Sequence, residues 1–215
     1  AKLTGITSTG AGTTDVTALH STASADLSNL TTTTVTAEHV SGSVNYTGNH
    51  GDFVVTVTAG VANVDSATPS SGSYAVASGA TLQGTAAKLT GITSTGAGTT
   101  DVTALAADTN MANIGTTTKT ATVTGSITYT GTSLGSGVAY TISDGATFTA
   151  PGQRVHGNTF ANSSTGVLQV TVGSDNDVVD LSGGVTVTDM NGTTVETLIN
   201  ANTTYTSNFF TASSD

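Results

Sequence analysis

The stretch AKLTGITSTGAGTTDVTAL occupies residues 1–19 and recurs without a single change at residues 87–105, 86 positions later. A match of this length does not arise by chance, even in a chain of biased composition. Self-similarity on this scale is typical of proteins built from repeated structural units. The repeat therefore indicates a chain built from repeated structural units.

Weaker likenesses follow each copy of this segment. The sequence SGSVNYTG at residues 41–48 parallels TGSITYTG at 124–131, and SYAVASGATLQG at 73–84 parallels AYTISDGATFTA at 139–150. A third version of the latter ending is TLINANTTYTS at 197–207. Gly and Asn accept positive φ, so we expect the same turn three times. Its turn residues are Gly79, Gly145 and Asn202, and the strands that follow are expected to begin at Thr81, Thr147 and Thr204.

These likenesses divide the chain into three modules. They are residues 1–86, residues 87–155, which repeat the first module, and a divergent C-terminal module at residues 156–215. Because the spacing inside the modules differs, the pattern indicates duplication with loop variation and not a tight solenoid.

The composition favours strands. Thr accounts for 49 of the 215 residues, and Thr and Val are β-branched side chains that suit the pleated strand. Strand-like runs such as Phe53–Val57 and Val138–Ile142 are separated by turn signals every 8–12 residues or so, among them a turn at Asp144-Gly145. Asn191-Gly192 carries the signal of a type I′ hairpin. We therefore predict an all-β protein of repeated small β-sandwich or barrel-like modules with Gly/Thr-rich turns. Short helices starting near Asp15 and Asp101 are the local alternative.

The charge balance excludes several classes of partner. There are 4 basic residues against 14 acidic ones, so the clustered cations that bind nucleic acid or an anionic membrane surface are missing. The chain has no Cys, which excludes a disulfide framework or a thiol nucleophile. No apolar run is long enough for a membrane span, and no signal-peptide pattern is visible. We expect a protein made in the cytoplasm and assembled later.

Three motifs offer chemistry, and each has a simpler interpretation. Asp175, Asp177 and Asp180 form a candidate calcium site, but a solvated turn fits the same residues better. Residues 131–135 fit G-x-S-x-G without the strand and helix that a hydrolase needs around it. The adjacent Glu38 and His39 are interpreted as a polar pair at a strand edge. We therefore expect no catalytic residues, no metal site, no cofactor and no enzymatic activity.

The segments SGSVNYTG, TGSITYTG and YTISDGATF resemble those of tailed-phage capsid decoration (cement) and head-fibre proteins. The resemblance implies a virion protein that binds and stabilises a capsid lattice, with the major capsid protein or like subunits as partners and a homo-oligomer, often a trimer, as the bound form. A secreted bacterial or archaeal filament, adhesin or surface-layer subunit is the alternative, with an extracellular location.

The duplicated segment itself is the candidate partner-binding element. It carries few large apolar residues, which suits a strand lying on another surface. The hypothesis places partner contacts at Leu3 and Ile6 of the first copy and at Leu89 and Ile92 of the second. The alternative is that both copies are ordinary strands kept alike by recent duplication.

Overall fold

The computed structural model describes residues 6–20, 22–49, 53–68, 72–155, 157–162, 165–172, 178–180, 186–187, 195–199 and 204–206. The chain divides into two compact units. Unit 1 comprises Ala1–Thr103 and Met111–Thr120, and unit 2 comprises Ala104–Asn110 and Ala121–Asp215.

Unit 1 is built from short strands and one turn of helix. The strands are β1 (Ser8–Leu19), β2 (Thr22–Asp26), β3 (Leu30–His39), β4 (Ser43–Asn49), β5 (Val54–Val57), β6 (Val61–Asn63), β7 (Ala67–Thr68), β8 (Ser73–Val76), β9 (Thr81–Gly84) and β10 (Thr93–Val102), with α1 (Ala86–Leu89) before β10. Strand β11 (Ile114–Val123) begins in unit 1 and ends in unit 2.

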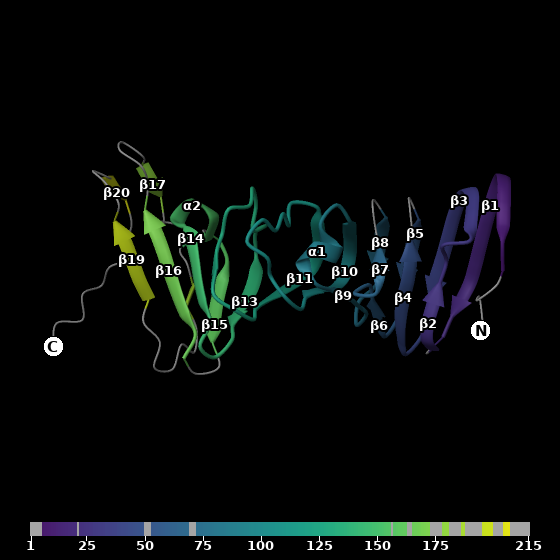
Figure 1. The fold of residues 1–215 in the computed structure, drawn as a ribbon, viewed down its shortest axis with the longest axis horizontal. Coiled ribbons are helices and arrows are strands. Elements are labelled where there is room, and N and C mark those ends of the chain that lie inside the picture. The colour runs from purple at the N-terminus through teal and green to yellow at the C-terminus, as the bar shows by residue number, and fades with distance from the viewer. Residues whose placement is uncertain are drawn as a thin grey trace. The chain divides into compact units, whose positions relative to one another are not determined.

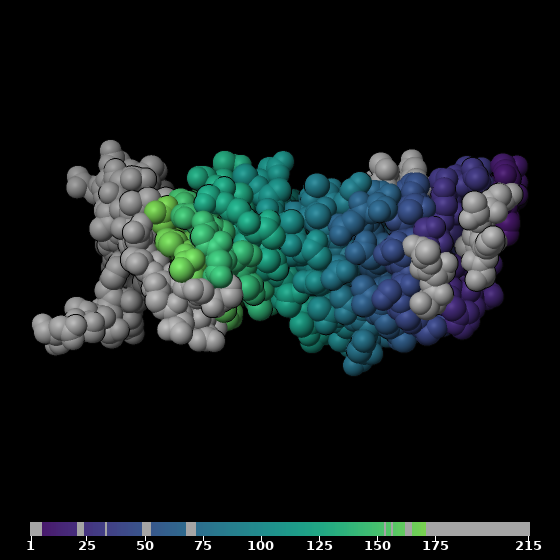
Figure 2. Space-filling view, turned by 60° about the horizontal axis from the view of Figure 1, so that its bottom comes forward, coloured from purple at the N-terminus to yellow at the C-terminus, as the bar shows by residue number. Residues whose placement is uncertain are grey.

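These strands form the successive coils of a parallel β-solenoid. Strand β5 pairs in parallel with β3 before it and with β8 after it, and Thr81 of β9 pairs with Val61 of β6, 20 residues earlier. The rows run β1-β3-β5-β8-β10 and β2-β4-β6-β9, and β9 also pairs with β10 (Figure 1). In a solenoid each coil contacts only the coils before and after it. Figure 2 shows this as bands of colour that follow chain order within unit 1.

The core of unit 1 lies inside the coils. Side chains alternate between the two faces of a strand, so every second residue points inward. In β5 and β8 the inward residues are Val55, Val57, Tyr74 and Val76, all essentially inaccessible to solvent. The alternation of the sequence therefore places apolar side chains on the inner face of these strands, while the outer face carries Thr and Ser together with small or apolar residues such as Val54 and Ala75.

Unit 2 repeats this construction. Its strands are β12 (Ile127–Thr128), β13 (Val138–Ile142), β14 (Thr147–Pro151), β15 (Thr159–Asn162), β16 (Val167–Val172), β17 (Val178–Asp180), β18 (Thr186–Val187), β19 (Val195–Ile199) and β20 (Thr204–Thr206), with α2 (Gly152–Val155) after β14. The rows are β13-β15-β18, β12-β14-β16-β19 and β17-β20. Inside them Tyr140 stacks on Phe160 with ring centroids 4.9 Å apart, and Phe148 lies 6.0 Å from both rings.

Polar side chains also stack from coil to coil. In unit 1 the Asn63 amide donates to Gln83 Oε1 at 3.1 Å, and Gln83 Nε2 donates to Asp101 Oδ2 at 3.0 Å. The hydroxyl of Thr120 donates to Asp101 Oδ1 at 2.7 Å. This polar ladder joins four consecutive coils by side-chain hydrogen bonds in addition to the strand pairing.

The prediction of an all-β protein is confirmed, but its finer form is wrong. The modules are not β-sandwiches or barrels, and the exclusion of a solenoid was incorrect, because the paired strands run parallel and come from successive coils. The predicted turn at Asp144-Gly145 joins β13 to β14, and these two strands pair with strands of other coils. The Asn191-Gly192 hairpin lies outside the described residues.

Two local expectations have opposite outcomes. The recurrent turn is confirmed at Gly79 and Gly145, whose φ values are 80° and 70°, and Thr81, Thr147 and Thr204 each begin a strand. Asn202 is outside the described residues. The helices considered near Asp15 and Asp101 are wrong, because both residues lie in long strands. None of the helices in the described residues has the length and apolar character of a membrane span.

Candidate interaction surface

The two copies of the duplicated segment fold alike. Each copy makes the same three side-chain hydrogen bonds, one within the segment and two to the strand paired beside it, which is β3 in the first copy and β11 in the second. They join Ser8 to Thr14, Thr32 to Thr14 and Thr36 to Asp15 in the first copy, and Ser94 to Thr100, Thr116 to Thr100 and Thr120 to Asp101 in the second. The two copies therefore make the same hydrogen bonds along the strand, although β1 continues to Leu19 and β10 ends at Val102.

The neighbours on the other side differ. Strand β10, in the second copy, pairs in parallel with β8 through Thr93–Thr95 and with β9 through Thr99–Val102. Strand β1, in the first copy, pairs only with β3 among the described residues (Figure 1). The first copy thus presents a strand edge whose counterpart in the second copy is covered by a whole coil.

This difference changes the exposure of identical side chains. Ile6 is 48% exposed, whereas Ile92 is 1% exposed. Ser94 and Thr100 are completely buried, whereas Ser8 and Thr14 are only half-buried. Ile6 is one of two large apolar side chains exposed in the described part of the chain, and the other is Val54 on β5.

The glycines of the segment show the same contrast. A Cβ built on Gly98 would lie 2.4 Å from the Ala77 carbonyl oxygen, and one on Gly96 would lie 2.4 Å from that of Val76. No heavy atom would lie within 4 Å of a Cβ on Gly10 or Gly12. Glycine is thus required in the second copy by the close approach of the preceding coil, and in the first copy that space is open.

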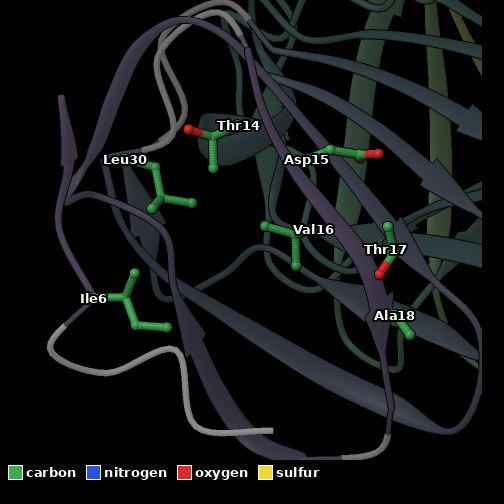
Figure 3. Close-up of a pocket in the computed structure, with 7 residues that line it drawn as sticks. All are labelled: Ile6, Thr14, Asp15, Val16, Thr17, Ala18 and Leu30. Atoms are coloured by element: carbon green, nitrogen blue, oxygen red, sulfur yellow. The ribbon is translucent and has the colours of Figure 1, made fainter. Parts of the chain in front are cut away.

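A shallow groove of about 340 Å³ lies at this uncovered end. It is lined by Ile6, by residues Thr14–Ala18 of β1 and by Leu30 of β3. Figure 3 shows the side chains of Ile6, Val16 and Leu30 directed into the same space, while the carboxylate of Asp15 points away from it. We call β1, Ile6 and this groove the open end of unit 1.

The predicted partner-binding residues are therefore not equivalent in the fold. Ile6 lies at the open end, whereas Leu89 and Ile92 are buried inside unit 1. Leu3 lies outside the described residues. The partner contact itself stays a prediction, and within unit 1 only Ile6 of these side chains is placed at the surface.

The candidate calcium residues are only partly described. Asp175 and Asp177 lie outside the described residues, and Asp180 is the last residue of β17. Among the residues that the structure describes, no group of three or more potential ligands gathers in one place.

The G-x-S-x-G stretch lacks the surroundings of a nucleophile. Ser133 accepts a hydrogen bond from the Gly135 amide at 3.1 Å and forms an isolated bridge with Asn110. The next element along the chain is strand β13 and not a helix. These residues form part of a connection between strands.

Glu38 and His39 point to opposite faces of β3, as adjacent strand residues do. His39 is fully buried, and its Nε2 donates to the carbonyl oxygens of Ser41 and Gly42 at 3.1 Å. Burial lowers the pKa of His39, which outweighs the opposing effect of these two carbonyls. The neutral ring is a structural part of the turn at residues 40–42.

Comparisons with known proteins found no matching family model, no similar curated protein and no similar solved structure.

Sequence reasoning missed one likeness beyond residue 19, in the strand that pairs beside each copy. Asn29 and Asn113 accept hydrogen bonds from the amides of Ser8 and Ser94, which makes Leu30 and Ile114 equivalent. The signal was present as SNLTTTT at residues 28–34 and ANIGTTT at 112–118. Aligning these stretches would have indicated the strand that lies beside each copy, β3 for the first and β11 for the second.

Proposed function

We propose that this chain is a non-enzymatic structural protein that binds and stabilises a particle lattice, as a capsid decoration (cement) or fibre protein of a tailed phage. The proposal rests on one observation: within the described residues, the parallel coils of unit 1 carry a strand, β1, that pairs on one side only and lies beside an exposed Ile6 and a groove lined partly by apolar side chains. An unpaired strand edge with apolar surface is a template for association with another chain.

The construction of the coils supports the same function. Each coil is tied to the next by backbone pairing, by a closely packed apolar interior and, in unit 1, by the polar ladder from Asn63 to Thr120. Such a stack gains its stability from repeated neighbour contacts. That property suits a component whose task is to persist on a particle surface.

A secreted filament, adhesin or surface-layer subunit is the second candidate. The open end favours it too, because a heterologous contact at a strand edge can continue from copy to copy into a filament. The two candidates differ in where the chain is found and in what it binds.

The test compares purified virions with the secreted and cell-surface fractions of the same culture by quantitative mass spectrometry. The proposal expects the chain in virions at a fixed ratio to the major capsid protein. It also expects particles stripped of the chain to recover their heat resistance when the purified chain is added back. A chain found only in the surface fraction, with no effect on stripped particles, would support the second candidate instead.

A further inference from the structure

A histidine interrupts a row of aliphatic side chains inside unit 1. His39 of β3 lies in line with three residues of neighbouring coils, and all four side chains are buried: Leu19 of β1, Val57 of β5 and Val76 of β8. Its Nδ1 is buried too and has no hydrogen-bond partner among the described residues. The ring therefore fits this interior only as the neutral form with its proton on Nε2, because a second proton would create a buried charge and an unpaired donor.

The neutral ring holds the turn that follows β3 against the next coil. Nε2 donates to the carbonyl oxygens of Ser41 and Gly42, each at 3.1 Å. The Gly42 carbonyl also accepts from the amide of Val61, the first residue of β6, at 2.8 Å. The amide of Thr58 donates to the carbonyl of His39 itself at 2.8 Å. Displacing the ring would therefore disturb two backbone hydrogen bonds that join β3 and its turn to the following coil.

The surroundings offer no counter-ion to a protonated ring. None of the carboxylates on neighbouring elements is hydrogen-bonded to His39. Glu38 lies on the opposite face of β3, Asp15 of β1 is exposed and accepts from Thr36, and Asp26 of β2 accepts from the amide of Ser28. Burial raises the pKa of Tyr46 on β4 and of Tyr74 on β8, so both stay neutral.

The one other imidazole recorded at this turn adds like charge. Nδ1 of the exposed His20 is hydrogen-bonded to the Ser41 hydroxyl at 3.0 Å. The described residues of β5 and β6 carry no titratable side chain. Protonation of both rings would therefore place two positive charges at the same turn, which disfavours the closed arrangement further.

The second copy of the repeat shows the same position without an ionisable group. His39 and Val123 each lie three residues after the threonine that hydrogen-bonds the aspartate of the duplicated segment, Thr36 or Thr120. Both are 0% exposed. The Val123 carbonyl accepts from the amide of Ser143 at 2.9 Å, as the His39 carbonyl does from its partner in the next coil. An aliphatic side chain therefore suffices at this place in a coil, and the histidine adds sensitivity to protons.

We propose that His39 is an acid-sensitive switch: when its ring takes up a proton it leaves the interior, and the turn after β3 separates from the following coil. Burial keeps the pKa of His39 in the closed form below the ordinary value of 6.5. The open form binds the proton more readily, so opening should increase as the pH falls below that ordinary value. The inference is independent of the proposed function and concerns a conformational device within unit 1.

The experiment is amide hydrogen exchange of the full chain at about pH 7 and about pH 5, followed by NMR and corrected for the chemical effect of pH on exchange. We expect the protection of the Thr58 amide to fall about tenfold or more at the lower pH. The amide of Ser143, its counterpart in the second copy, is the matched control and should keep its protection within about twofold. Unchanged protection of Thr58, or an equal loss at Ser143, would overturn the proposal.

Two variants assign the effect to the ring. His39→Val introduces the residue that the second copy has, and it should abolish the acid-dependent loss at Thr58. Should this variant fail to fold, His39→Gln makes the same comparison, because its amide can donate to the turn carbonyls but does not titrate. A loss of protection at Thr58 that persists in either folded variant would contradict the proposal.

Discussion

At the scale of single residues, the duplicated segment shows that the burial of a side chain depends on the neighbouring coils and not only on the local sequence. Ile6 and Ile92 stand in the two identical copies of residues 1–19, yet one is half-exposed and the other is buried. The hydrophobic contribution of a side chain follows the area that it removes from water. The two isoleucines therefore contribute unequally to the stability of the folded chain.

The first prediction follows from this asymmetry. Ile92→Asp places an unpaired carboxylate in a dry interior and should lower the free energy of unfolding by about 4 kcal/mol or more. Ile6→Asp should lower it by less than about 1 kcal/mol, because this side chain keeps much of its contact with water. Urea titrations of both variants at high dilution measure the difference. Equal losses for the two variants would mean that the copies are equally covered.

The second prediction concerns His39. Its pKa in the folded chain lies below the ordinary value of 6.5, chiefly because the ring is buried. Between those two pKa values the unfolded chain binds more protons, so the free energy of unfolding falls as the pH falls through this interval. We expect the melting temperature to decline as the pH falls from about 7 to about 5. At higher pH His39 should not contribute to the pH dependence of the melting temperature.

The variant His39→Gln tests this assignment. Its side-chain amide can still donate to the carbonyls of Ser41 and Gly42 but does not titrate. The decline of melting temperature below pH 6.5 should become shallower. The parent chain, measured over the same pH range, provides the control. An unchanged slope in His39→Gln would assign the pH dependence to other groups.

At the scale of elements, the polar ladder allows a second comparison between the copies. Asp101 accepts hydrogen bonds from Gln83 and Thr120, whereas its counterpart Asp15 accepts one from Thr36. Removing Asp101 also leaves the half-buried Gln83 amide without this acceptor, and such losses cost about 1–3 kcal/mol.

The third prediction is therefore that Asp101→Ala destabilises the chain more than Asp15→Ala does. Thermal unfolding by calorimetry compares them, with Asp15→Ala expected to cost about 1 kcal/mol or less. A larger loss at Asp15 would show that the ladder between coils contributes little.

The sequence predicted strands well and strand partners poorly. Alternation in segments such as Val138–Ile142, and the turns at Gly79 and Gly145, are local signals, and local signals report the conformation of a strand and its ends. They do not say which other strand lies beside it. Antiparallel neighbours and parallel neighbours one coil away leave the same period-two pattern, so the expected sandwich and the observed solenoid could not be separated in this way.

At the scale of the whole chain, the sequence does contain a repeat of one coil in length, but this repeat is much shorter and weaker than the duplicated segment. Asn63, Gln83, Asp101 and Thr120 recur at intervals of about 20 residues, the length of one coil, and they stack on one another. The identical segments lie 86 residues apart, which spans several coils. The identical segments therefore drew attention to a period of 86 residues, and the period of about 20 residues that corresponds to one coil was overlooked.

The candidate interaction surface was predictable in part. Few large apolar groups in residues 1–19 pointed to a segment that needs a partner, and Ile6 does lie at the open end. The same argument applied to Leu89 and Ile92 could not foresee that a coil of the chain itself covers them. Coverage depends on what precedes each copy along the chain, and that information is not in the repeated segment.

The fourth prediction concerns metal removal. No ligand cluster is present among the described residues, and the coils are held by strand pairing and apolar packing. Chelation of divalent cations should therefore leave the melting temperature nearly unchanged. A drop on chelation that calcium reverses and magnesium does not would point to Asp175, Asp177 and Asp180 as a calcium site.

The central claim is that parallel strands from successive coils lie side by side, and engineered disulfides test it most directly. Thr56 of β5 pairs with Ala75 of β8, and both side chains are exposed, so the variant Thr56→Cys with Ala75→Cys should form an intramolecular disulfide on mild oxidation. Thr95 of β10 pairs with Ala75 from the other side, two coils from Thr56 and about 9–10 Å away. That distance exceeds the reach of a disulfide, so Thr56→Cys with Thr95→Cys should keep two free thiols. Mass spectrometry that counts free thiols would contradict the solenoid if the first pair stayed reduced, or if the second pair closed as readily as the first.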